Sequence, residues 1–316
     1  MKNILVVGSC NMDLVIHTSR LPALGETIRG NGFETVPGGK GLNQAVATAK
    51  LGGSVAMIAC VGEDTFGEEL RETLSEAGVD ISGVTTNGPG SGIAVITVCG
   101  GDNHIILDAG ANARLTPQML EAYRPLFERA DWVVLQLEIP RDTALCAAKL
   151  AKECGASVLL NPAPFADWAE TLFPYTDLLM PNRVEAEQLL RHPIALPDTA
   201  DAVRELLARG IPAVIITLGG EGCVYHTRNA IYRQPACTVP VVDTTGAGDA
   251  FVGGFCAAVC GGDYDIMAAV AYATAVSAMV VGRRGASTSL PRKMDVERFG
   301  GRSMKRRRFF FPLSDK

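Results

Sequence analysis

The sequence lacks an excess of basic residues and a hydrophobic run long enough to cross a membrane. Its 29 lysines and arginines are outnumbered by 34 aspartates and glutamates, which gives a formal net charge of −5. Because binding to a phosphate backbone depends on dense positive charge, we expect no nucleic-acid partner. The longest apolar tract, residues 268–282, is shorter than the roughly 20 residues of a membrane span. It also contains Tyr, Thr and Ser, so we expect a core helix there and no membrane contact.

Closely spaced cysteine pairs are also absent, as is a signal peptide. The nine cysteines include no Cys-x-x-Cys pair, and the closest two, Cys256 and Cys260, are four residues apart on a predicted helix. We interpret the cysteines as buried thiols of a reducing compartment. Residues 1–8 run directly into a strand-like segment without the charged start, apolar stretch and small-residue cleavage site of a signal peptide. We therefore expect a cytoplasmic protein.

Two common nucleotide-binding motifs are missing. The turn after the first predicted strand lacks G-x-G-x-x-G, and G-x-x-x-x-G-K-[ST] occurs nowhere in the chain. The first motif is typical of dinucleotide-dependent enzymes and the second of P-loop ATPases. Both classes are therefore disfavoured.

Short β-branched runs alternate with segments of helix length along most of the chain. The predicted strands are Ile4–Val7, Ala56–Val61, Trp132–Leu137, Ser157–Asn161, Leu178–Met180 and Ala213–Leu218. Amphipathic stretches such as Gly67–Ala77 and Thr199–Arg209 separate them, which indicates strands covered on both faces by crossover helices. We therefore predict one domain over residues 1–316, with an α/β fold whose doubly wound, mainly parallel sheet is flanked by helices.

Two regions, about residues 12–36 and 92–107, break this alternation because they contain strand-like segments and turn residues but no helix. Ile93–Val98 and His104–Leu107, separated by Gly-Gly-Asp-Asn, predict a hairpin. We expect the two regions to form a small β-sheet lid that covers a ligand or a partner subunit. Residues 300–316 form an atypical tail with a basic and aromatic run. We interpret it as a frayed or packed terminus and assign it no function.

The strongest local signal is Val242–Phe251, in which a strand end passes through a glycine turn into an apolar helix. Backbone N–H groups at such a helix N-terminus attract anions, so Gly246, Ala247 and Gly248 predict a phosphate-binding nest. Asp249, in the first turn of the helix, is the candidate base for an attacking hydroxyl. A base beside an anion hole suits phosphoryl transfer. The alternative, that Asp249 only caps the helix, is equally consistent with the spacing.

A second glycine cluster, Pro37–Ala45, precedes an alanine-rich helix. Its glycines admit a polar ligand close to the backbone, and Asn43 offers donors and an acceptor to a sugar diol. A hinge of the lid, or a plain turn before a helix, explains the glycines equally well.

Polar residues also follow several of the predicted strands. Asn11 and Asp13 come after the first strand, on one side of the chain if it is extended there, although a turn would also use these residue types. Glu138 and Asn182–Glu185 follow two later strands. Because the carboxyl ends of parallel strands meet at one edge of a sheet, these positions predict a ligand site there.

Together these segments resemble the ribokinase-like (phosphofructokinase B type) carbohydrate kinases, from the start of the chain to about Pro291. The segments that carry the resemblance are Asn11–Asp13, Gly25–Thr27, Gly38–Ala45, Asp108–Asn112, Asn182–Glu185, Thr217–Gly219 and Asp243–Asp249. The resemblance implies ATP-dependent phosphorylation of the primary 5-hydroxyl of a small pentose, with D-ribose as the leading candidate. It also implies a homodimer joined through the lid. Leu42 departs from the alanine that is usual in the family, so we expect it to affect the fit of the sugar.

The resemblance further implies roles for individual residues, with Asp249 as the base and Gly246, Ala247 and Gly248 as the anion hole. The sugar-binding residues would be Asn11, Asp13, Gly39, Lys40, Gly41, Asn43, Glu138 and Asp249. The ATP-binding residues would be Asn182, Thr217, Leu218, Gly219, Gly220, Glu221, Gly222, Gly248 and Thr274. Glu185 would help to position Mg²⁺ through water, because that ion gives up its hydration reluctantly. An activating K⁺ would be held, mostly by backbone oxygens, at Asp243, Thr245, Val280, Arg283, Gly285 and Ser289.

Two other kinds of function remain open. The same scaffold could phosphorylate deoxyribose, another small sugar or a nucleoside. Asp13 favours ribose, because a carboxylate placed for vicinal hydroxyls would be left partly unpaired by a deoxy sugar. A non-catalytic sugar-binding regulator is the alternative from another class, and the presence of Asp249 with a complete glycine nest counts against it.

Overall fold

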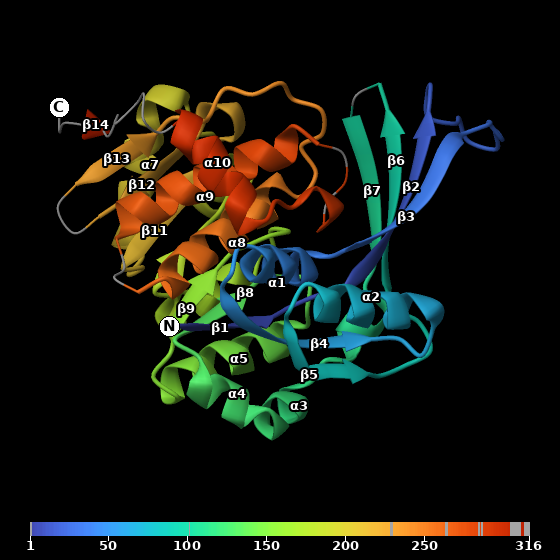
Figure 1. Cartoon of the computed structure of the whole chain (residues 1–316), viewed down its shortest axis with the longest axis horizontal. Coiled ribbons are helices and arrows are strands. Elements are labelled where there is room, and N and C mark those ends of the chain that lie inside the picture. Colours follow the sequence, from blue (N-terminus) through green and yellow to red (C-terminus); the bar gives the residue numbers. More distant parts are fainter. Residues whose placement is uncertain are drawn as a thin grey trace.

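The computed structural model describes residues 2–100, 102–227, 230–262, 265–283, 285, 287–303 and 311–312. Its largest element is a ten-stranded sheet with the strand order β14-β13-β12-β11-β10-β9-β8-β1-β4-β5 (Figure 1). These strands are β1 (Asn3–Val7), β4 (Ser54–Val61), β5 (Asp80–Thr86), β8 (Trp132–Leu135), β9 (Ser157–Leu160), β10 (Leu178–Leu179), β11 (Ala213–Thr217), β12 (Cys223–His226), β13 (Ile231–Gln234) and β14 (Phe311–Pro312).

Most of this sheet is parallel. β1 pairs in parallel with β4 on one side and with β8 on the other, so that Val6 lies opposite both Met57 and Val134. The parallel part continues through β9 and β10 to β11, and from β4 to β5. β12, β13 and β14 extend it as antiparallel strands. The chain therefore proceeds outward from β1 in both directions, which confirms the doubly wound arrangement predicted from the sequence.

Successive residues of the strands point into two separate cores, one on each face of the sheet. Ile4 and Val6 of β1 belong to one core, whereas Leu5 and Val7 belong to the other, and none of the four is more than 2% exposed. A strand that is covered on both faces has to be apolar at every position rather than at alternate ones. The continuous apolar runs of the sequence have this cause.

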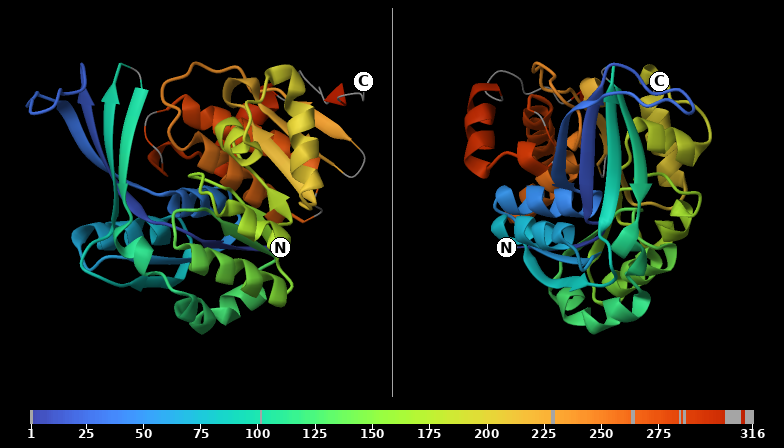
Figure 2. Two further views of the ribbon diagram at one scale, coloured as in Figure 1. Left: turned by 180° about the vertical axis from the view of Figure 1, so that it is seen from behind. Right: turned by 90° about the vertical axis from the view of Figure 1, so that its right-hand side faces the viewer.

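Helices cover both faces of the sheet, as the right-hand view of Figure 2 shows. One face carries α1 (Lys40–Lys50), α2 (Thr65–Glu76), α8 (Ala247–Cys260), α9 (Ile266–Val281) and α10 (Lys293–Ser303). The other carries α3 (Pro117–Ala122), α4 (Arg124–Arg129), α5 (Arg141–Glu153), α6 (Arg183–Leu190) and α7 (Thr199–Ala208). The 3-10 helices are η1 (Gly110–Arg114), η2 (Ala169–Tyr175), η3 (Leu196–Asp198), η4 (Gly219–Glu221) and η5 (Ser287–Ser289). Within the described residues, no helix combines the length and the apolar character of a membrane span.

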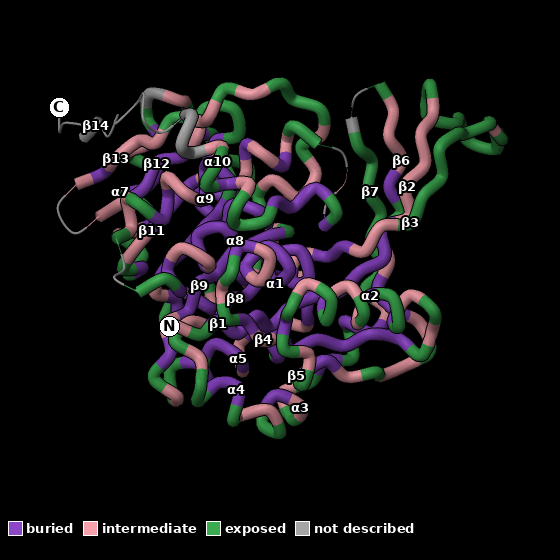
Figure 3. Tube along the Cα trace, viewed as in Figure 1, coloured by how far each residue is buried: buried purple, intermediate pink, exposed green. Residues whose placement is uncertain are grey.

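A second sheet, of four strands, stands off the main body (Figure 1). In the order β3-β2-β6-β7, its strands are β3 (Asn31–Gly38), β2 (Asn11–Thr18), β6 (Gly92–Cys99) and β7 (Asp102–Asp108). The central strands β2 and β6 are parallel, and both outer pairs are antiparallel. Figure 3 shows that much of this sheet is exposed. The apolar side chains of Phe33 and Ile106 are 64% and 72% exposed. The two regions predicted to form a small sheet therefore do so.

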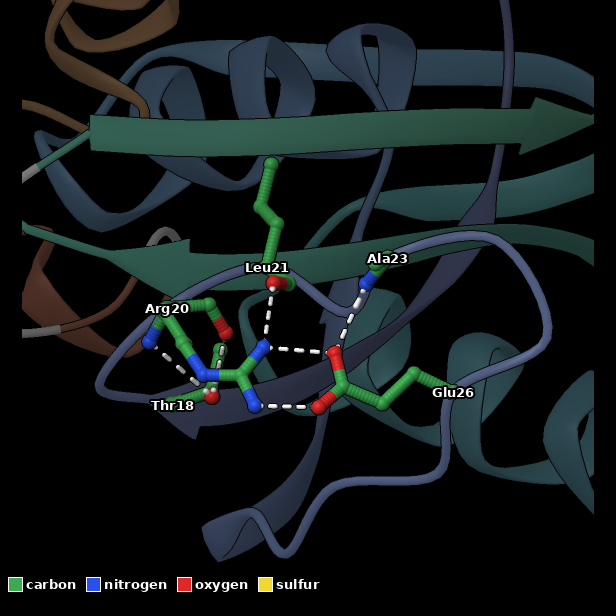
Figure 4. Close-up of polar contacts among 5 residues, drawn as sticks. All are labelled: Thr18, Arg20, Leu21, Ala23 and Glu26. Carbon is green, nitrogen blue, oxygen red and sulfur yellow. Dashed lines mark hydrogen bonds and ion pairs between the residues drawn. The ribbon is translucent and has the colours of Figure 1, made fainter.

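The loop between β2 and β3 is held by the carboxylate of Glu26 (Figure 4). Both carboxylate oxygens accept hydrogen bonds from the guanidinium of Arg20, and Oε2 also accepts one from the backbone N–H of Ala23 at 2.9 Å. The hydrogen bonds from Arg20 lower the pKa of Glu26 to about 2. Glu26, one of the residues on which the family resemblance was based, thus organises the outer end of the small sheet.

The observed strands differ from the predicted ones mainly at their carboxyl ends. The strand predicted as Trp132–Leu137 ends at Leu135, because the backbone N–H of Leu137 donates to Ala163 O rather than to a neighbouring strand. The other predicted strands of the main sheet also end one residue early or begin one or two residues sooner. Of the atypical tail, residues 304–310 and 313–316 lie outside the described residues. They include the basic and aromatic run except for Phe311, which begins β14.

Candidate active site

The candidate site lies at the carboxyl edge of the parallel strands. Glu138 follows β8, Asn161 follows β9, Asn182 follows β10, and Thr217 ends β11. Asn182 and Thr217 form a parallel bridge, and the backbone N–H of Thr217 donates to Pro181 O at 3.0 Å. Ligand sites of doubly wound folds form at this edge, because the strand order reverses there and opens a crevice.

Asp249 is the third residue of α8 and is only 8% exposed. The N-cap of α8 is Gly246, in the left-handed conformation with φ 72°, and it provides no side-chain cap. Asp249 Oδ2 accepts a hydrogen bond from Asn43 Nδ2 at 3.0 Å, and Oδ1 accepts one from Gln44 Nε2 at 2.9 Å. Both carboxylate oxygens are therefore engaged with α1, and the alternative that Asp249 only caps its own helix is wrong.

Close packing of α1 against α8 brings these residues together. A Cβ atom on Gly253 of α8 would overlap the Cβ of Ala47 on α1 and would lie 2.9 Å from Gln44 O. Glycine is therefore required at the helix contact, since any side chain would push the helices apart. The closeness of the two helices lets the short amide of Asn43 reach the carboxylate of Asp249.

The second glycine cluster brings the start of α1 against the start of β2. Gly39 has φ +90°, and a Cβ on it would lie 2.7 Å from the backbone nitrogen of Asn11. Asn11 (5% exposed) and Asp13 (7%) are buried, like Asn43 (6%). Asn11 Oδ1 accepts a hydrogen bond from Asn112 Nδ2 at 2.8 Å, which orients the Asn11 amide. The structure thus gathers the polar residues of both predicted ligand segments in one place.

Glu138 ties the end of β8 to both of these segments. Its Oε2 accepts hydrogen bonds from Ser9 Oγ at 2.5 Å and from the backbone N–H of Lys40 at 3.1 Å. The Ser9 hydroxyl also accepts a longer bond from the N–H of Gly41 at 3.4 Å. Glu138 therefore fixes the start of α1.

Four carboxylates act on the side chain of Lys40. Burial alone would lower the pKa of Lys40, but Asp249, Glu138, Glu185 and Asp13 together raise it. Burial, with smaller contributions from Glu138 and Asp249, raises the pKa of Asp13 to about 7. Burial also raises the pKa of Glu138, and that of Glu185 to about 7. The acid cluster, as we call Asp13, Glu138, Glu185 and Asp249, is thus partly balanced by a single ammonium group.

Glu185 also closes the N-terminus of α6. Asn182 and Glu185 form a capping box, in which Asn182 Oδ1 accepts from the N–H of Glu185 at 2.9 Å and Glu185 Oε2 accepts from the N–H of Asn182 at 2.8 Å. The second oxygen, Oε1, accepts from Asn182 Nδ2 at 2.8 Å. Each oxygen retains a lone pair, so the carboxylate is oriented but can still accept a hydrogen bond from water.

Two cavities meet beside Asp249. The reaction cavity, as we call it, has a volume of about 170 Å³ and is lined by Lys40, Asn161, Ala163, Met180, Asn182, Glu185, Thr217, Gly246, Gly248, Asp249 and Val252. The nucleotide cavity has a volume of about 500 Å³ and is lined by Asn182, Thr217, Gly219, Gly220, Gly222, Ala236, Cys237, Thr238, Val239, Val241, Thr244, Ala247, Gly248, Phe251, Thr274, Ser277, Ala278 and Val281. Both include Asn182, Thr217 and Gly248, so the two spaces adjoin there.

Most residues that were predicted to bind ATP line the nucleotide cavity, and two do not. Leu218 is 8% exposed, and its backbone N–H donates to Gly222 O at 2.7 Å within the turn after β11. Glu221 is exposed and pairs with Arg233 of β13 at 2.6 Å. Thr274 of α9 does line the cavity, and its hydroxyl donates to Val270 O at 2.8 Å.

The residues predicted to hold K⁺ are partly linked through Asp243. Its Oδ1 accepts from the N–H and hydroxyl of Thr245 at 2.9 and 2.7 Å, and its Oδ2 accepts from the N–H of Gly285 at 3.0 Å. Val280 lies near the end of α9, where its carbonyl accepts from the N–H of Arg283. Ser289 is buried in η5. All of these groups would present oxygen, the donor atom that hard cations prefer.

Three buried amides beside Asp249 were not singled out as site residues from the sequence. Gln44 and Gln136 are 1% and 0% exposed, and Asn161 is 9% exposed. Gln44 donates to Asp249, Gln136 donates to Gln44, and Asn161 accepts from Gln44. Gln44 lies inside a segment that carried the family resemblance, and Gln136 is a polar residue within the otherwise apolar segment predicted as the strand Trp132–Leu137. These two features could have identified Gln44 and Gln136 as site residues from the sequence.

This arrangement combines three chemical capacities. Asp249 can accept a proton, the first turn of α8 offers backbone N–H groups that have no intrahelical acceptor, and a large, mostly apolar cavity adjoins both. Of the three predicted anion-hole amides, that of Ala247 also donates to Thr244 O at 3.2 Å. A proton acceptor beside an anion-binding turn suits transfer of a phosphoryl group to a hydroxyl.

Comparison with known proteins agrees with this chemistry. The sequence profile described as pfkB family carbohydrate kinase matches residues 1–293. The chain is 38% identical over 310 residues to a ribokinase of Schizosaccharomyces pombe, covering 94% of this chain and 97% of that protein. It is 35% identical over 309 residues to a deoxyribokinase of Salmonella typhi, again covering 94% and 97%.

The fold is similar to that of a solved structure with bound ligands. The Arabidopsis thaliana ribokinase complexed with ribose and ATP matches with a TM-score of 0.86 at 31% sequence identity, covering 94% of this chain and 98% of that one.

Proposed function

This chain belongs to the pfkB family of carbohydrate kinases, and from that membership we propose that it transfers the terminal phosphoryl group of ATP to the 5-hydroxyl of D-ribose. The products are ribose 5-phosphate and ADP. The observation that carries the proposal is the position of Asp249, which lines the reaction cavity at the point where that cavity adjoins the nucleotide cavity. A sugar hydroxyl beside Asp249 would therefore lie close to the end of a bound triphosphate.

Asp249 acts as the base in this mechanism. The hydroxyl oxygen of the sugar attacks the terminal phosphorus, the bond from phosphorus to the bridging oxygen of ADP breaks, and the hydroxyl proton passes to the Asp249 carboxylate. Backbone N–H groups of Gly246, Ala247 and Gly248 stabilise the negative charge of the moving phosphoryl group. Lys40, which also lines the reaction cavity, adds a positive charge there.

Sugar binding is assigned to the start of β2, the start of α1 and the end of β8. Asn43 Oδ1 is buried and has no hydrogen-bond partner among the described residues, so it can accept a bond from a sugar hydroxyl. Asp13 can accept from two vicinal hydroxyls, and such bonds favour its ionised form. The further residues that we assign to the sugar are Asn11, Gly39, Lys40, Gly41 and Glu138.

ATP binding is assigned to the nucleotide cavity, whose glycines and apolar side chains suit a flat base and ribose. The residues that we assign to it are those predicted ATP-binding residues that line the cavity, namely Asn182, Thr217, Gly219, Gly220, Gly222, Gly248 and Thr274. Mg²⁺ would accompany the nucleotide and supply positive charge to the transferred group. Among the described residues there is no group of three His, Cys, Asp or Glu side chains suited to a metal ion, so we assign Glu185 to contact Mg²⁺ through water.

An activating K⁺ is assigned to the oxygen-rich turns beside the anion hole. The hydrogen bonds of Asp243 to Thr245 and Gly285 support this, because they hold two of the assigned segments together next to the start of α8. A cation there would add to the positive potential at the anion hole. Val280, Arg283 and Ser289 complete the assigned set.

The small sheet is assigned two roles, those of a lid and of a dimer contact. Its strands β2 and β3 lead directly into Asn11 and the glycine cluster, so a movement of the sheet would change access to the sugar site. Ile105, Ile106 and Leu107 of β7 are each at least 47% exposed, and a second copy of the chain would cover them. We also assign the protein to the cytoplasm, a reducing compartment that suits its free thiols.

A substrate panel tests the proposed function. ADP release is measured with Mg²⁺-ATP and K⁺ for ribose, deoxyribose, fructose, adenosine and no sugar. Preferential turnover of ribose is expected. Preferential turnover of deoxyribose, which the 35% identity to a deoxyribokinase makes the second candidate, would keep the mechanism and change the substrate. No turnover by folded protein, together with measurable ribose binding, would favour a sugar-binding regulator.

A further inference from the structure

A line of buried amides lies behind Asp249. Gln136 Nε2 donates to Gln44 Oε1 at 2.6 Å, and Gln44 Nε2 donates both to Asp249 Oδ1 at 2.9 Å and to Asn161 Oδ1 at 3.0 Å. Asn161 Nδ2 in turn donates to the carbonyl of Met180 at 2.9 Å. The line therefore links β8, α1 and the ends of β9 and β10 to the proposed base.

The amides of Gln44 and Asn161 are fixed in direction, because both ends of each are hydrogen-bonded. Gln44 uses both hydrogens of its amide nitrogen, and its oxygen accepts from Gln136, so the amide has no reason to rotate. Rotation would place Gln44 Oε1 against the carboxylate of Asp249, with one acceptor facing another. The backbone carbonyl of Met180 anchors the far end through Asn161, since a carbonyl can only accept.

Gln44 differs from its neighbour Asn43 in this respect. Both donate one hydrogen bond to Asp249, but Asn43 Oδ1 has no partner among the described residues, whereas Gln44 Oε1 is bonded to Gln136. A buried acceptor without a partner is available to a ligand, and a saturated amide is not. The two adjacent amides therefore have separate tasks.

We infer that Gln44 is a positioning residue for Asp249, and that Gln136 holds Gln44 in the orientation this requires. Gln44 anchors Oδ1 and so sets the plane of the carboxylate, leaving Oδ2, beside Asn43, toward the sugar hydroxyl. The inference rests on the proposed role of Asp249 as the base. A hydrogen bond to the ionised carboxylate also stabilises that form, so loss of Gln44 should make Asp249 easier to protonate.

The variant Gln44→Met tests this inference, because it keeps the length of the side chain and removes both polar atoms. The turnover number should fall by between about tenfold and a hundredfold, as for loss of one hydrogen bond to a charged group. The KM values for sugar and ATP should change by less than about threefold, because the saturated amide contacts neither substrate. The acidic limb of the kcat/KM profile should move to higher pH. Gln136→Met should also lower the turnover number and move the acidic limb of the kcat/KM profile to higher pH, but both changes should be smaller.

The other charged groups near Asp249 stay in place in these variants. They are Lys40 of α1, Glu138 after β8, Glu185 of α6 and Asp13 of β2. A matched control is Thr48→Val, one turn further along α1, whose hydroxyl donates to Gln44 O at 2.8 Å without contacting Asp249. It should lower the melting temperature and leave the pH profile unchanged.

Should Gln44→Met not fold, Gln44→Glu provides the second test. Its carboxyl group can donate to Asp249 only while protonated, so turnover relative to the unmodified protein should fall as the pH rises. An unchanged pH profile in both Gln44 variants, or an equal shift in Thr48→Val, would overturn the inference.

A second readout does not depend on turnover. In ¹³C-labelled protein, the Asp249 carboxyl signal, assigned by its loss in Asp249→Asn, should titrate at higher pH in Gln44→Met than in the unmodified chain. A shifted titration in protein that does not turn over sugar would refute the proposed function but support the contact between Gln44 and Asp249. Normal turnover with an unshifted titration would refute the role of Gln44 alone.

Discussion

The two cavities that adjoin at Asn182, Thr217 and Gly248 are built in different ways. The reaction cavity is small, and its lining includes three ionisable residues, Lys40, Glu185 and Asp249. The nucleotide cavity is about three times larger and contains mostly glycine, valine, alanine and threonine. The reaction cavity is therefore distinguished by its charged side chains, and the nucleotide cavity by the shape that its small, uncharged residues give it.

This difference follows from what each half of the proposed reaction requires. Proton and phosphoryl transfer need charges in fixed positions, and those charges have to be buried so that they act at low dielectric. A nucleotide base needs a surface of matching shape and few charges. A substitution in the reaction cavity should therefore have little effect on nucleotide binding, and a substitution in the nucleotide cavity should have little effect on the transfer step.

The largest effect should come from Asp249→Asn. Removing a general base lowers the turnover number by about 10² to 10⁴-fold, while the affinity for ATP should stay within a factor of about two because the nucleotide cavity is unchanged. The new amide would also face the donor groups of Asn43 or Gln44, so one of these should rotate. Steady-state kinetics with ATP titration measures both quantities.

A control for that variant is Asp265→Asn, which keeps a capping side chain at the start of α9, where Asp265 Oδ1 accepts from the N–H of Met267. It should leave turnover unchanged. Equal kinetics of Asp249→Asn and the unmodified protein would show that Asp249 is not the base.

Asp13→Asn, in the acid cluster, should have opposite effects on the stability of the protein and on its affinity for ribose. Burial raises the pKa of Asp13 to about 7 from its ordinary value of 3.8, so between these two pH values the folded protein binds a proton that the unfolded chain releases. The penalty for keeping Asp13 ionised therefore grows as the pH rises from about 4 and is complete above about 7. The variant should be more stable than the unmodified protein by on the order of 1–3 kcal/mol at pH 8, and by less at pH 5.

Urea unfolding at pH 8 and pH 5 measures that difference, and calorimetry of ribose binding should show weaker affinity for the variant. A stability difference that is independent of pH would contradict the raised pKa. Glu185→Gln offers a comparison, because the pKa of Glu185 is also about 7, although it caps α6 as well.

Ala278→Leu should affect the nucleotide cavity alone. Ala278 of α9 lines that cavity and is 8% exposed, so the larger side chain should fill part of the space for the nucleotide. Overpacking of this kind costs about 1–3 kcal/mol, which corresponds to a rise in the KM for ATP of between about fivefold and 150-fold. The turnover number at saturating ATP should change little. Ala268→Leu, at an exposed position of the same helix, is the control, and an equal rise in both variants would argue against the cavity as the nucleotide site.

The smallest effect should come from Glu221→Ala. Glu221 was predicted to bind ATP, but its carboxylate pairs with Arg233 and does not line the nucleotide cavity. The KM for ATP should rise by less than about threefold, as for loss of a surface ion pair. A tenfold rise would mean that ATP extends beyond the cavity toward β13.

Much of the architecture could be predicted from local patterns. β1 is apolar at each position from Ile4 to Val7 because both of its faces are covered there, and this pattern is visible without any structure. The strand ends could not be predicted as well. Leu137 looks like part of a strand, but its N–H donates to Ala163, a partner that only the folded chain provides.

The candidate site was predictable to a similar extent. Asp249 and the glycines before it form a compact local motif, so their chemistry could be inferred from residues a few positions apart. Glu221 was assigned by its place in a motif, and the structure instead turns its side chain toward Arg233. Leu42 was expected to affect the sugar, and it belongs to the core beneath α1, with none of its surface exposed.

The sequence by itself determined the fold class, the family and the identity of the proposed base, because periodic burial and glycine turns are properties of neighbouring residues. Only the tertiary structure decided which groups surround that base. Gln44 and Asp249 are 205 positions apart, and Gln136 is 92 positions from Gln44. Their contacts depend on how closely α1 packs on α8 and β8. The raised pKa values of Asp13 and Glu185 have the same origin, since burial and neighbouring charge exist only after folding.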